Sequence, residues 1–167
     1  MSSPRDYTPY HEIPVEKLFS LLKDPVVKVR LDAPVRIDRT FEIPYLAGYN
    51  RTGTVVYIDK MLPRTFPSGN AHYPVDPFLM VHEKVEKALL DALGWTYQEA
   101  HKVATLVKHL ELYFRVGVQP DTYEDFLRPY VKKALHQRLV NVPPDLDLTP
   151  YQDTHDYSVL KKLQEAQ

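Results

Sequence analysis

The stretch that most constrains the fold is residues 76–94, with the sequence DPFLMVHEKVEKALLDALG, because the signals at its two ends agree. Asp76 can cap a first helical turn that begins at Pro77, and Gly94 can adopt the left-handed conformation that closes a last turn. At about 100° per residue, the apolar side chains between them fall on one arc of a helix surface. The pattern therefore predicts an amphipathic helix over these residues.

Two ionisable residues interrupt the apolar arc of this helix. His82 and Glu86 are four residues apart, so one turn of helix places both on the same face. Glu83 falls at the border of the arc, and Lys87 falls on the side that we expect to face solvent. A buried imidazole and a buried carboxylate must be hydrogen-bonded, paired or bound to a metal ion, because an isolated buried charge costs too much free energy.

Composition excludes several classes of function. The 167 residues fit a single domain, 1–167, and the absence of cysteine excludes disulfides, thiolate metal ligands and a cysteine nucleophile. The 21 Lys and Arg against 22 Asp and Glu give no electrostatic reason to expect nucleic acid as a partner. We expect no membrane partner either, since no apolar run reaches the roughly 20 residues of a membrane span. Without the apolar core of a signal peptide, we expect a cytoplasmic protein; its oligomeric state has no sequence signal.

The N-terminal part mixes helical and strand patterns. Residues 1–13 contain two prolines and predict an extended arm, after which Pro14 opens a short helix that ends at Asp24 and Pro25. Apolar residues then alternate with polar ones, which predicts half-buried strands over 27–31, 35–38 and 41–43.

A hairpin signal follows these strands. Asn50 and Gly53 tolerate the positive φ angles of a tight turn, so residues 50–53 predict a hairpin that leads into a returning strand over 54–59. Residues 60–75 contain three prolines and a glycine and predict a long loop of the kind that often carries function.

A second helix is predicted to start after a short linker. Thr96 and Glu99 match a capping box, and a linker this short favours antiparallel packing on the first helix. Glu111 falls within its apolar stripe and His101 lies at the margin. The stripe itself consists of Ala100, Val103, Ala104, Val107, Leu110 and Phe114.

The C-terminal part predicts a third helix and an extended segment. The third helix opens with a box-like cap at 121–124 and contains Pro129, which we expect to kink it. Residues 141–158 are too rich in proline for a helix and predict an extended strap, and 159–167 predict one or two exposed helical turns. The expected fold class is α+β: an N-terminal helix, a small antiparallel sheet and three C-terminal helices, with extended proline-rich termini.

The segment from Val81 to Glu86, VHEKVE, resembles the active-site helix of zincin metallopeptidases. In that family two residues four apart bind zinc, and the glutamate after the first is the general base; an edge strand precedes the helix, and a further ligand follows on a later helix. The resemblance implies that His82 and Glu86 are ligands and that Glu83 is the base. The strand over 54–59 stands where the family has its edge strand, although this chain has Glu86 where the family has histidine.

The third ligand is left open by the sequence. With His101, the site has two imidazoles and one carboxylate, which is a zinc ligand set and also the set of non-haem iron enzymes. With Glu111, the site has one imidazole and two carboxylates and tolerates iron or manganese better.

Two functions from different classes therefore follow. The first is a zinc-dependent hydrolase that cleaves an amide bond of a protein or peptide substrate laid along the strand over 54–59. The second is a non-enzymatic interaction or assembly protein, such as a component of a phage or bacterial particle, in which proline- and tyrosine-rich ends bind a protein partner and His82 and Glu86 form a structural pair.

Overall fold

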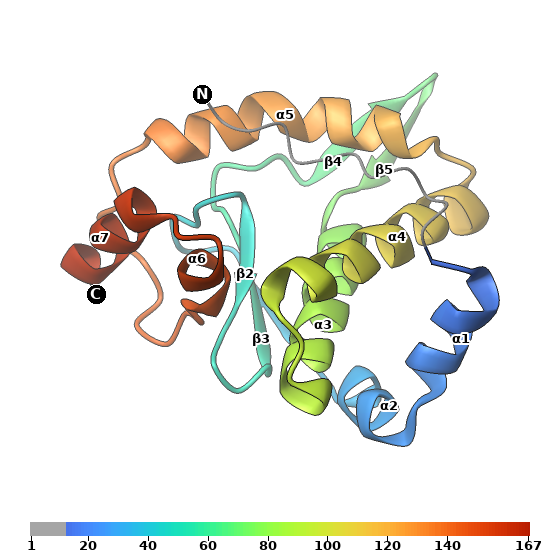
Figure 1. Cartoon of the computed structure of the whole chain (residues 1–167). Helices are drawn as coiled ribbons and strands as arrows, with labels where there is room; N and C mark the ends of the chain where they lie inside the picture. Colours follow the sequence, from blue (N-terminus) through green and yellow to red (C-terminus); the bar gives the residue numbers. More distant parts are fainter. Residues whose placement is uncertain (1–12) are drawn as a thin grey trace.

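The computed structural model describes residues 13–167, so the arm expected over 1–13 lies almost entirely outside the described residues. The described chain is α+β, as expected (Figure 1). Its helices are α1 Val15–Lys23, α2 Pro25–Asp32, α3 Asp76–Leu93, α4 Tyr97–Val116, α5 Pro120–His136, α6 Thr149–Asp153 and α7 Tyr157–Ala166. Its strands are β1 Arg36–Asp38, β2 Ala47–Tyr49, β3 Val55–Ile58, β4 Thr65–Ser68 and β5 Ala71–Pro74.

The main sheet is mixed rather than purely antiparallel. Its order is β1-β3-β2, with β1 parallel and β2 antiparallel to β3. The hairpin expected at residues 50–53 is confirmed, and Gly53 has a φ of 73° there. The edge position expected for the returning strand is wrong, because β3 is paired on both sides and all four of its residues are buried.

Two other expectations in the N-terminal half are wrong. Residues 27–31 lie in α2 instead of a strand, because the Asp24 carboxylate accepts the N–H groups of Val26 and Val27 and Pro25 occupies the first turn. Asp24 thus ends one helix and caps the next. Residues 41–43 form no strand, and the Ile43 N–H donates to the Asp59 carboxylate instead.

The segment expected to be a long loop contains a second hairpin. Strands β4 and β5 pair antiparallel across a turn in which Gly69 has a φ of 59°. The aromatic ring of Phe66 on β4 is fully buried and lies 4.9 Å, centroid to centroid, from the ring of Tyr123 on α5. The hairpin is thus part of the apolar core that it shares with α5.

The helices α3 and α4 follow the expected limits closely. Gly94 ends α3 with a φ of 63°, and Thr96 and Glu99 form both bonds of the capping box. The cap of α3 is Val75 rather than Asp76, whose carboxylate pairs with Arg39 at 2.7 Å. The two helices make the most extensive contact between any two elements of the described chain.

The second half of α4 departs from its expected buried stripe. Phe114 is 77% exposed, whereas Leu112 is fully buried. The buried side of α4 turns around the helix axis, because its first half packs on α3 and its second half packs on α5, through Leu112 and the Tyr123 cluster. A single apolar stripe along α4 therefore predicts the buried residues correctly only for about the first three turns of the helix.

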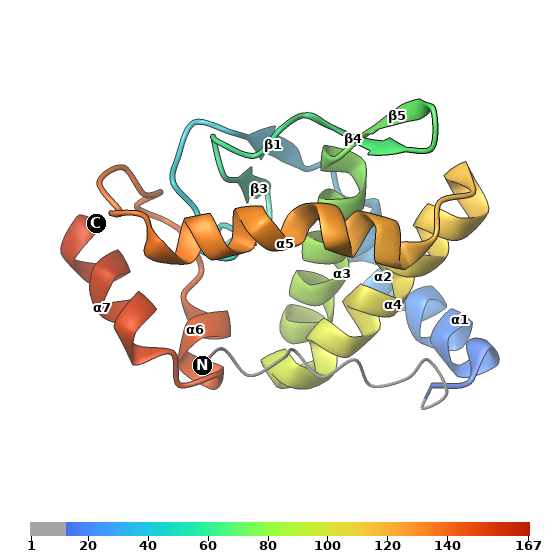
Figure 2. The same ribbon diagram turned by 90° about the horizontal axis from the view of Figure 1, so that it is seen from above.

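The C-terminal part is more helical than expected. The segment 141–158 includes α6, and α7 is not exposed, since Val159, Leu160 and Leu163 are buried. Helix α5 begins at Pro120, before the expected cap, and continues past Pro129 to His136. Figure 2 shows α5 crossing the molecule from the end of α4 towards α7. Within residues 13–167, none of the helices combines the length and apolar character that crossing a membrane requires.

Candidate metal site

Three side chains expected as metal ligands converge between α3 and α4. His82 and Glu86 come from one face of α3, and His101 comes from the first half of α4. The His101 Nδ1 atom lies 2.9 Å from Glu86 Oε2 and 3.2 Å from His82 Nε2, and His82 Nε2 lies 3.3 Å from Glu86 Oε2. The structure thus brings together one oxygen and two nitrogens of the kind that bind metal ions.

The spacing of these atoms fits the ligand shell of zinc. Tetrahedral zinc has nitrogen and oxygen ligands at about 2.0–2.1 Å, which separates the ligand atoms by about 3.3 Å. The three observed separations, 2.9, 3.2 and 3.3 Å, are close to this value.

Hydrogen bonds account for two sides of this triangle, because His82 Nε2 and His101 Nδ1 are both within reach of Glu86 Oε2. The third side joins the two ring nitrogens, which lie 3.2 Å apart. Tyr97 adds a fourth polar atom, because its hydroxyl oxygen lies 3.1 Å from His101 Nδ1, and its ring packs against the imidazole at a centroid distance of 5.1 Å. A cation at the centre can contact all three ligand atoms at once.

Glu86 is held by a residue that the sequence did not single out. The Tyr49 hydroxyl, at the end of β2, donates to Glu86 Oε1 over 2.9 Å, while Oε2 faces the two histidines. Burial raises the pKa of Tyr49 far above its usual range, and the nearby charges of Glu86 and Glu83 raise it further. The hydroxyl therefore remains a donor. No local pattern reveals this contact, because 37 residues separate the two partners.

The site carries an anionic carboxylate beside neutral imidazole. Burial acts to raise the pKa of Glu86, but hydrogen bonds from His101 and His82 outweigh it and lower the pKa to about 2. Burial lowers the pKa of His82 to about 4, against the hydrogen bond to Glu86. Near neutral pH the cluster therefore combines a buried negative charge with an uncharged His82, which is the protonation state that metal binding requires.

The outer nitrogen of His82 has no hydrogen-bond partner among the described residues. His82 Nδ1 is buried, and nothing within residues 13–167 accepts from it or donates to it. Metal-bound histidines usually donate this second N–H to a carboxylate or carbonyl. No carboxylate or carbonyl of the described residues accepts a hydrogen bond from His82 Nδ1.

Glu83, the expected general base, is buried rather than at the edge of the helix surface. Only 7% of it is exposed, and its charge acts on Tyr49 and on Tyr151 of α6, raising the pKa of both after the effect of burial. Together with Tyr49 and Lys87 it lines a cavity of about 100 Å³ between α2, α3 and the turn after β2. The cavity is not lined by His82, Glu86 or His101, so the expected base faces a different space from the one between the three candidate ligands.

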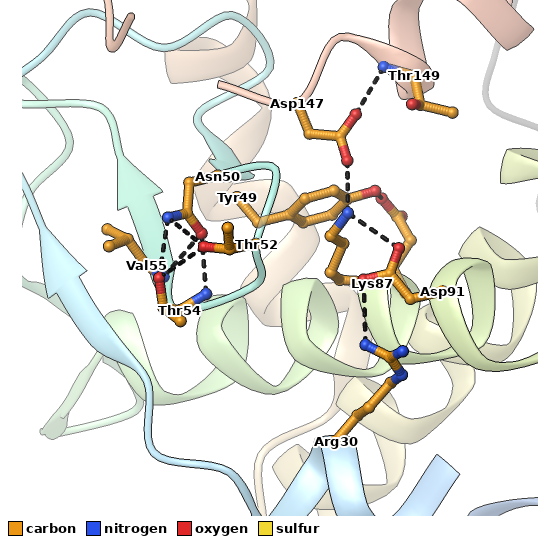
Figure 3. Close-up of polar contacts among 11 residues, drawn as sticks. Arg30, Tyr49, Asn50, Thr52, Thr54, Val55, Lys87, Asp91, Asp147 and Thr149 are labelled. Carbon is orange, nitrogen blue, oxygen red and sulfur yellow. Dashed lines mark hydrogen bonds and ion pairs between the residues drawn. The ribbon is translucent and has the colours of Figure 1, made fainter. Parts of the chain in front are cut away.

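Lys87 was expected to face solvent, but it is buried. Its ammonium group lies 2.7 Å from Asp147 and 3.0 Å from Asp91, and 5.4 Å from the centroid of the Tyr49 ring. Figure 3 shows the lysine side chain beside the tyrosine ring and between the two carboxylates. These carboxylates compensate the buried positive charge, which the helix periodicity alone could not indicate.

The edge of the sheet beside the site is already occupied. Asp147 donates its N–H to the Tyr49 carbonyl at 2.9 Å, and Arg51 donates its N–H to the Asp145 carbonyl at 3.0 Å. The bridge between Asn50 and Leu146 completes this short antiparallel pairing with β2. A peptide therefore cannot add to β2 here, nor to the central strand β3 as expected from the sequence.

The alternative ligand Glu111 is not part of the site. It lies in the half of α4 that packs near α5, its side chain is 40% exposed, and it faces Arg115 at 3.8 Å. The structure therefore places His101, and not Glu111, beside His82 and Glu86.

A second buried polar cluster lies between α4 and α5. Glu124 accepts from Lys108 at 2.5 Å and from His109 at 2.9 Å. Burial acts to raise the pKa of Glu124, but the charge of Lys108 and the bonds from both partners lower it well below its usual range. The expected cap at 121–124 is wrong, because α5 already begins at Pro120 with Gln119 as its cap residue and no side-chain cap bond, and Glu124 pairs with α4 instead.

Comparison of the chain with protein-family profiles, with curated proteins and with solved structures gave no match.

Proposed function

We propose that this protein binds zinc through His82, Glu86 and His101. The observation that carries the proposal is the triangle of ligand atoms with sides of 2.9–3.3 Å, contributed by two helices that pack closely. Two imidazoles and one carboxylate form a zinc ligand set that leaves a fourth position for water or substrate. Iron and manganese accept the same ligands and are the competing ions.

We further propose that the bound metal serves hydrolysis of an amide or peptide bond. A zinc ion supplies Lewis acidity, which polarises a carbonyl group. Glu83 accepts a proton from the attacking water and passes it to the leaving nitrogen as the carbon–nitrogen bond breaks. Glu83 directly follows the proposed ligand His82 on α3 and is buried, which supports this role.

The direction of approach follows from exposure and from the occupied sheet edge. His101 has the most exposed side chain of the three ligands, at 22%, compared with 7% for His82 and 3% for Glu86. Residues 145–147 of the chain itself pair with β2. The substrate therefore approaches from the side of His101 and does not pair with the sheet as an added strand.

Zinc titration followed by calorimetry tests the metal proposal. Protein purified without added metal, then stripped with a chelator, should bind close to one zinc ion per chain, and Glu83→Gln should bind equally well. A panel of quenched fluorescent peptides and small N-acyl amides should be cleaved by the unaltered protein and not by Glu83→Gln. A stripped protein that binds no zinc, iron or manganese contradicts the proposal.

The alternative function, a non-enzymatic assembly protein, is favoured by a different observation. The helices α1 and α2 expose four large apolar side chains: Val15, Phe19, Val26 and Val29 are 51%, 52%, 54% and 72% exposed. Exposed apolar side chains on neighbouring helices suit a contact with a protein partner. Under this alternative the His82 and Glu86 pair is structural, and Glu83→Gln changes neither metal content nor any activity.

A further inference from the structure

The two oxygens of Glu86 have different partners. Oε2 faces His82 and His101, whereas Oε1 accepts the hydroxyl of Tyr49 at 2.9 Å. Glu86 is 2% exposed, and so is Tyr49, so no bulk water competes for either oxygen. One carboxylate therefore presents one oxygen to the histidines and keeps the other for the tyrosine.

Tyr49 is fixed in place from several sides. It pairs with Val56 of β3, and its carbonyl accepts the N–H of Asp147 at 2.9 Å. The Lys87 ammonium lies 5.4 Å from its ring centroid and is itself held by Asp147 and Asp91 (Figure 3). The hydroxyl is thus aimed at Glu86 by the sheet, the C-terminal segment and α3 together.

We propose that Tyr49 is a positioning residue that occupies Glu86 Oε1, so that Glu86 binds the metal through Oε2 alone. This inference rests on the proposed metal site, and it concerns how the ligand is presented. A carboxylate with a free second oxygen can bind a cation through both oxygens, which fills the position that a substrate needs. Partners of metal ligands commonly set ligand orientation in this way, and their loss weakens metal binding by about 10- to 100-fold.

The test is Tyr49→Phe, which removes the hydroxyl and keeps the ring. Zinc affinity measured by competition with a chromogenic chelator should fall about 10- to 100-fold. Cobalt(II) is a spectroscopic probe of the same site: the unaltered protein should give the strong visible bands of four-coordinate cobalt. The variant should give weaker bands, because the freed oxygen raises the coordination number.

Tyr57→Phe is the matched control. Tyr57 lies on the neighbouring strand β3, is also buried, and donates its hydroxyl to Asp145 at 2.5 Å rather than to a proposed metal ligand. It should leave zinc affinity and the cobalt spectrum unchanged. Thermal unfolding of both variants without metal identifies any loss of affinity that merely follows a loss of folded protein.

The outcomes separate the inference from the proposal beneath it. If the unaltered protein binds zinc and Tyr49→Phe shows the same affinity and cobalt spectrum, the positioning role is wrong and the metal site stands. If the folded, unaltered protein binds neither zinc nor cobalt, both are wrong. An equal loss of affinity in Tyr49→Phe and Tyr57→Phe also overturns the positioning role, because it then reflects the sheet as a whole.

Discussion

The clusters around Glu86 and Glu124 are built alike and differ in charge. Each is a carboxylate, more than three-quarters buried, that accepts from two nitrogen-bearing side chains across a helix interface. Glu124 has a lysine at 2.5 Å, so its negative charge is compensated within the protein. Glu86 has two imidazoles, and the pKa of His82 is lowered to about 4, which leaves that ring uncharged near neutral pH.

The metal proposal predicts that an ion binds at Glu86 rather than at Glu124. Lys108 supplies a positive charge to Glu124, whereas neutral His82 supplies none to Glu86. Burial is the largest effect that keeps His82 neutral, and the nearby His101 and Lys108 lower its pKa further, whereas the hydrogen bond to Glu86 acts in the opposite direction. The structural cluster thus contributes to the protonation state of the candidate metal site.

The largest expected effect is on metal affinity. Glu86→Gln removes the anionic ligand and should weaken zinc binding by more than about 100-fold, since even outer partners of metal ligands account for about 10- to 100-fold. Glu124→Gln should change zinc affinity less than threefold. Calorimetric titration of both variants checks the contrast, and equal losses contradict the assignment of the ion to the first cluster.

The two clusters should also respond to acid in different ranges. The folded pKa of His82, about 4, is below its usual 6.5, so the unfolded state takes up its proton first as the pH falls. The stability that neutral His82 provides is complete above pH 6.5 and is lost as the pH falls towards 4, by up to about 3 kcal/mol.

The contribution of Glu124 is lost in a lower range. Its folded pKa is below the usual 4.5, so its contribution is complete above that value and declines only below it. Urea unfolding of the metal-free protein between pH 7 and pH 3 measures both ranges, and Glu124→Gln should retain the decline between pH 6.5 and 4.5. A variant that loses this decline contradicts the assignment to His82.

A smaller effect is expected on the stability of the second cluster. Glu124→Gln leaves the buried Lys108 ammonium without its carboxylate and should reduce the free energy of unfolding by about 2–3 kcal/mol, since the Glu124 side chain is 23% exposed. The double variant Lys108→Met with Glu124→Leu should regain most of this loss, because apolar packing replaces both charges. Denaturant unfolding near neutral pH compares the three proteins.

The smallest effect is expected at Glu111. Its ion pair with Arg115 is at the surface, at 3.8 Å, so Glu111→Gln should change the free energy of unfolding by less than about 0.5 kcal/mol. Zinc affinity should not change either. A tenfold loss of affinity restores Glu111 as a candidate ligand.

Local signals in the sequence predicted the first cluster well. The spacing of His82 and Glu86, the end of α3 at Gly94 and the capping box at Thr96 are all short-range features, and together they set where His101 meets α3. Periodicity failed where a helix changes partner. It placed Glu111 and Phe114 inside, but the second half of α4 turns a different side towards α5.

Local sequence patterns could not predict contacts between segments that are far apart in the chain. Tyr49 meets Glu86 across 37 residues, and Lys87 meets Asp147 across 60. Alternation of apolar residues over 27–31 predicted a strand, but the Asp24 cap and Pro25 favour a helix in that segment. The Asp24-Pro25 pair carries this signal, because it can begin a helix as well as end one.

The pairing of residues 145–147 with β2 has a consequence for synthesis on the ribosome. The chain emerges from its N-terminus, so the backbone of Tyr49 gains its partner Asp147 only after almost one hundred further residues have been made. Until then β2 is an unprotected edge, open to pairing with another nascent chain. Contacts of such long sequence separation form slowly, so the backbone partner that holds Tyr49 beside Glu86 is in place only late in synthesis.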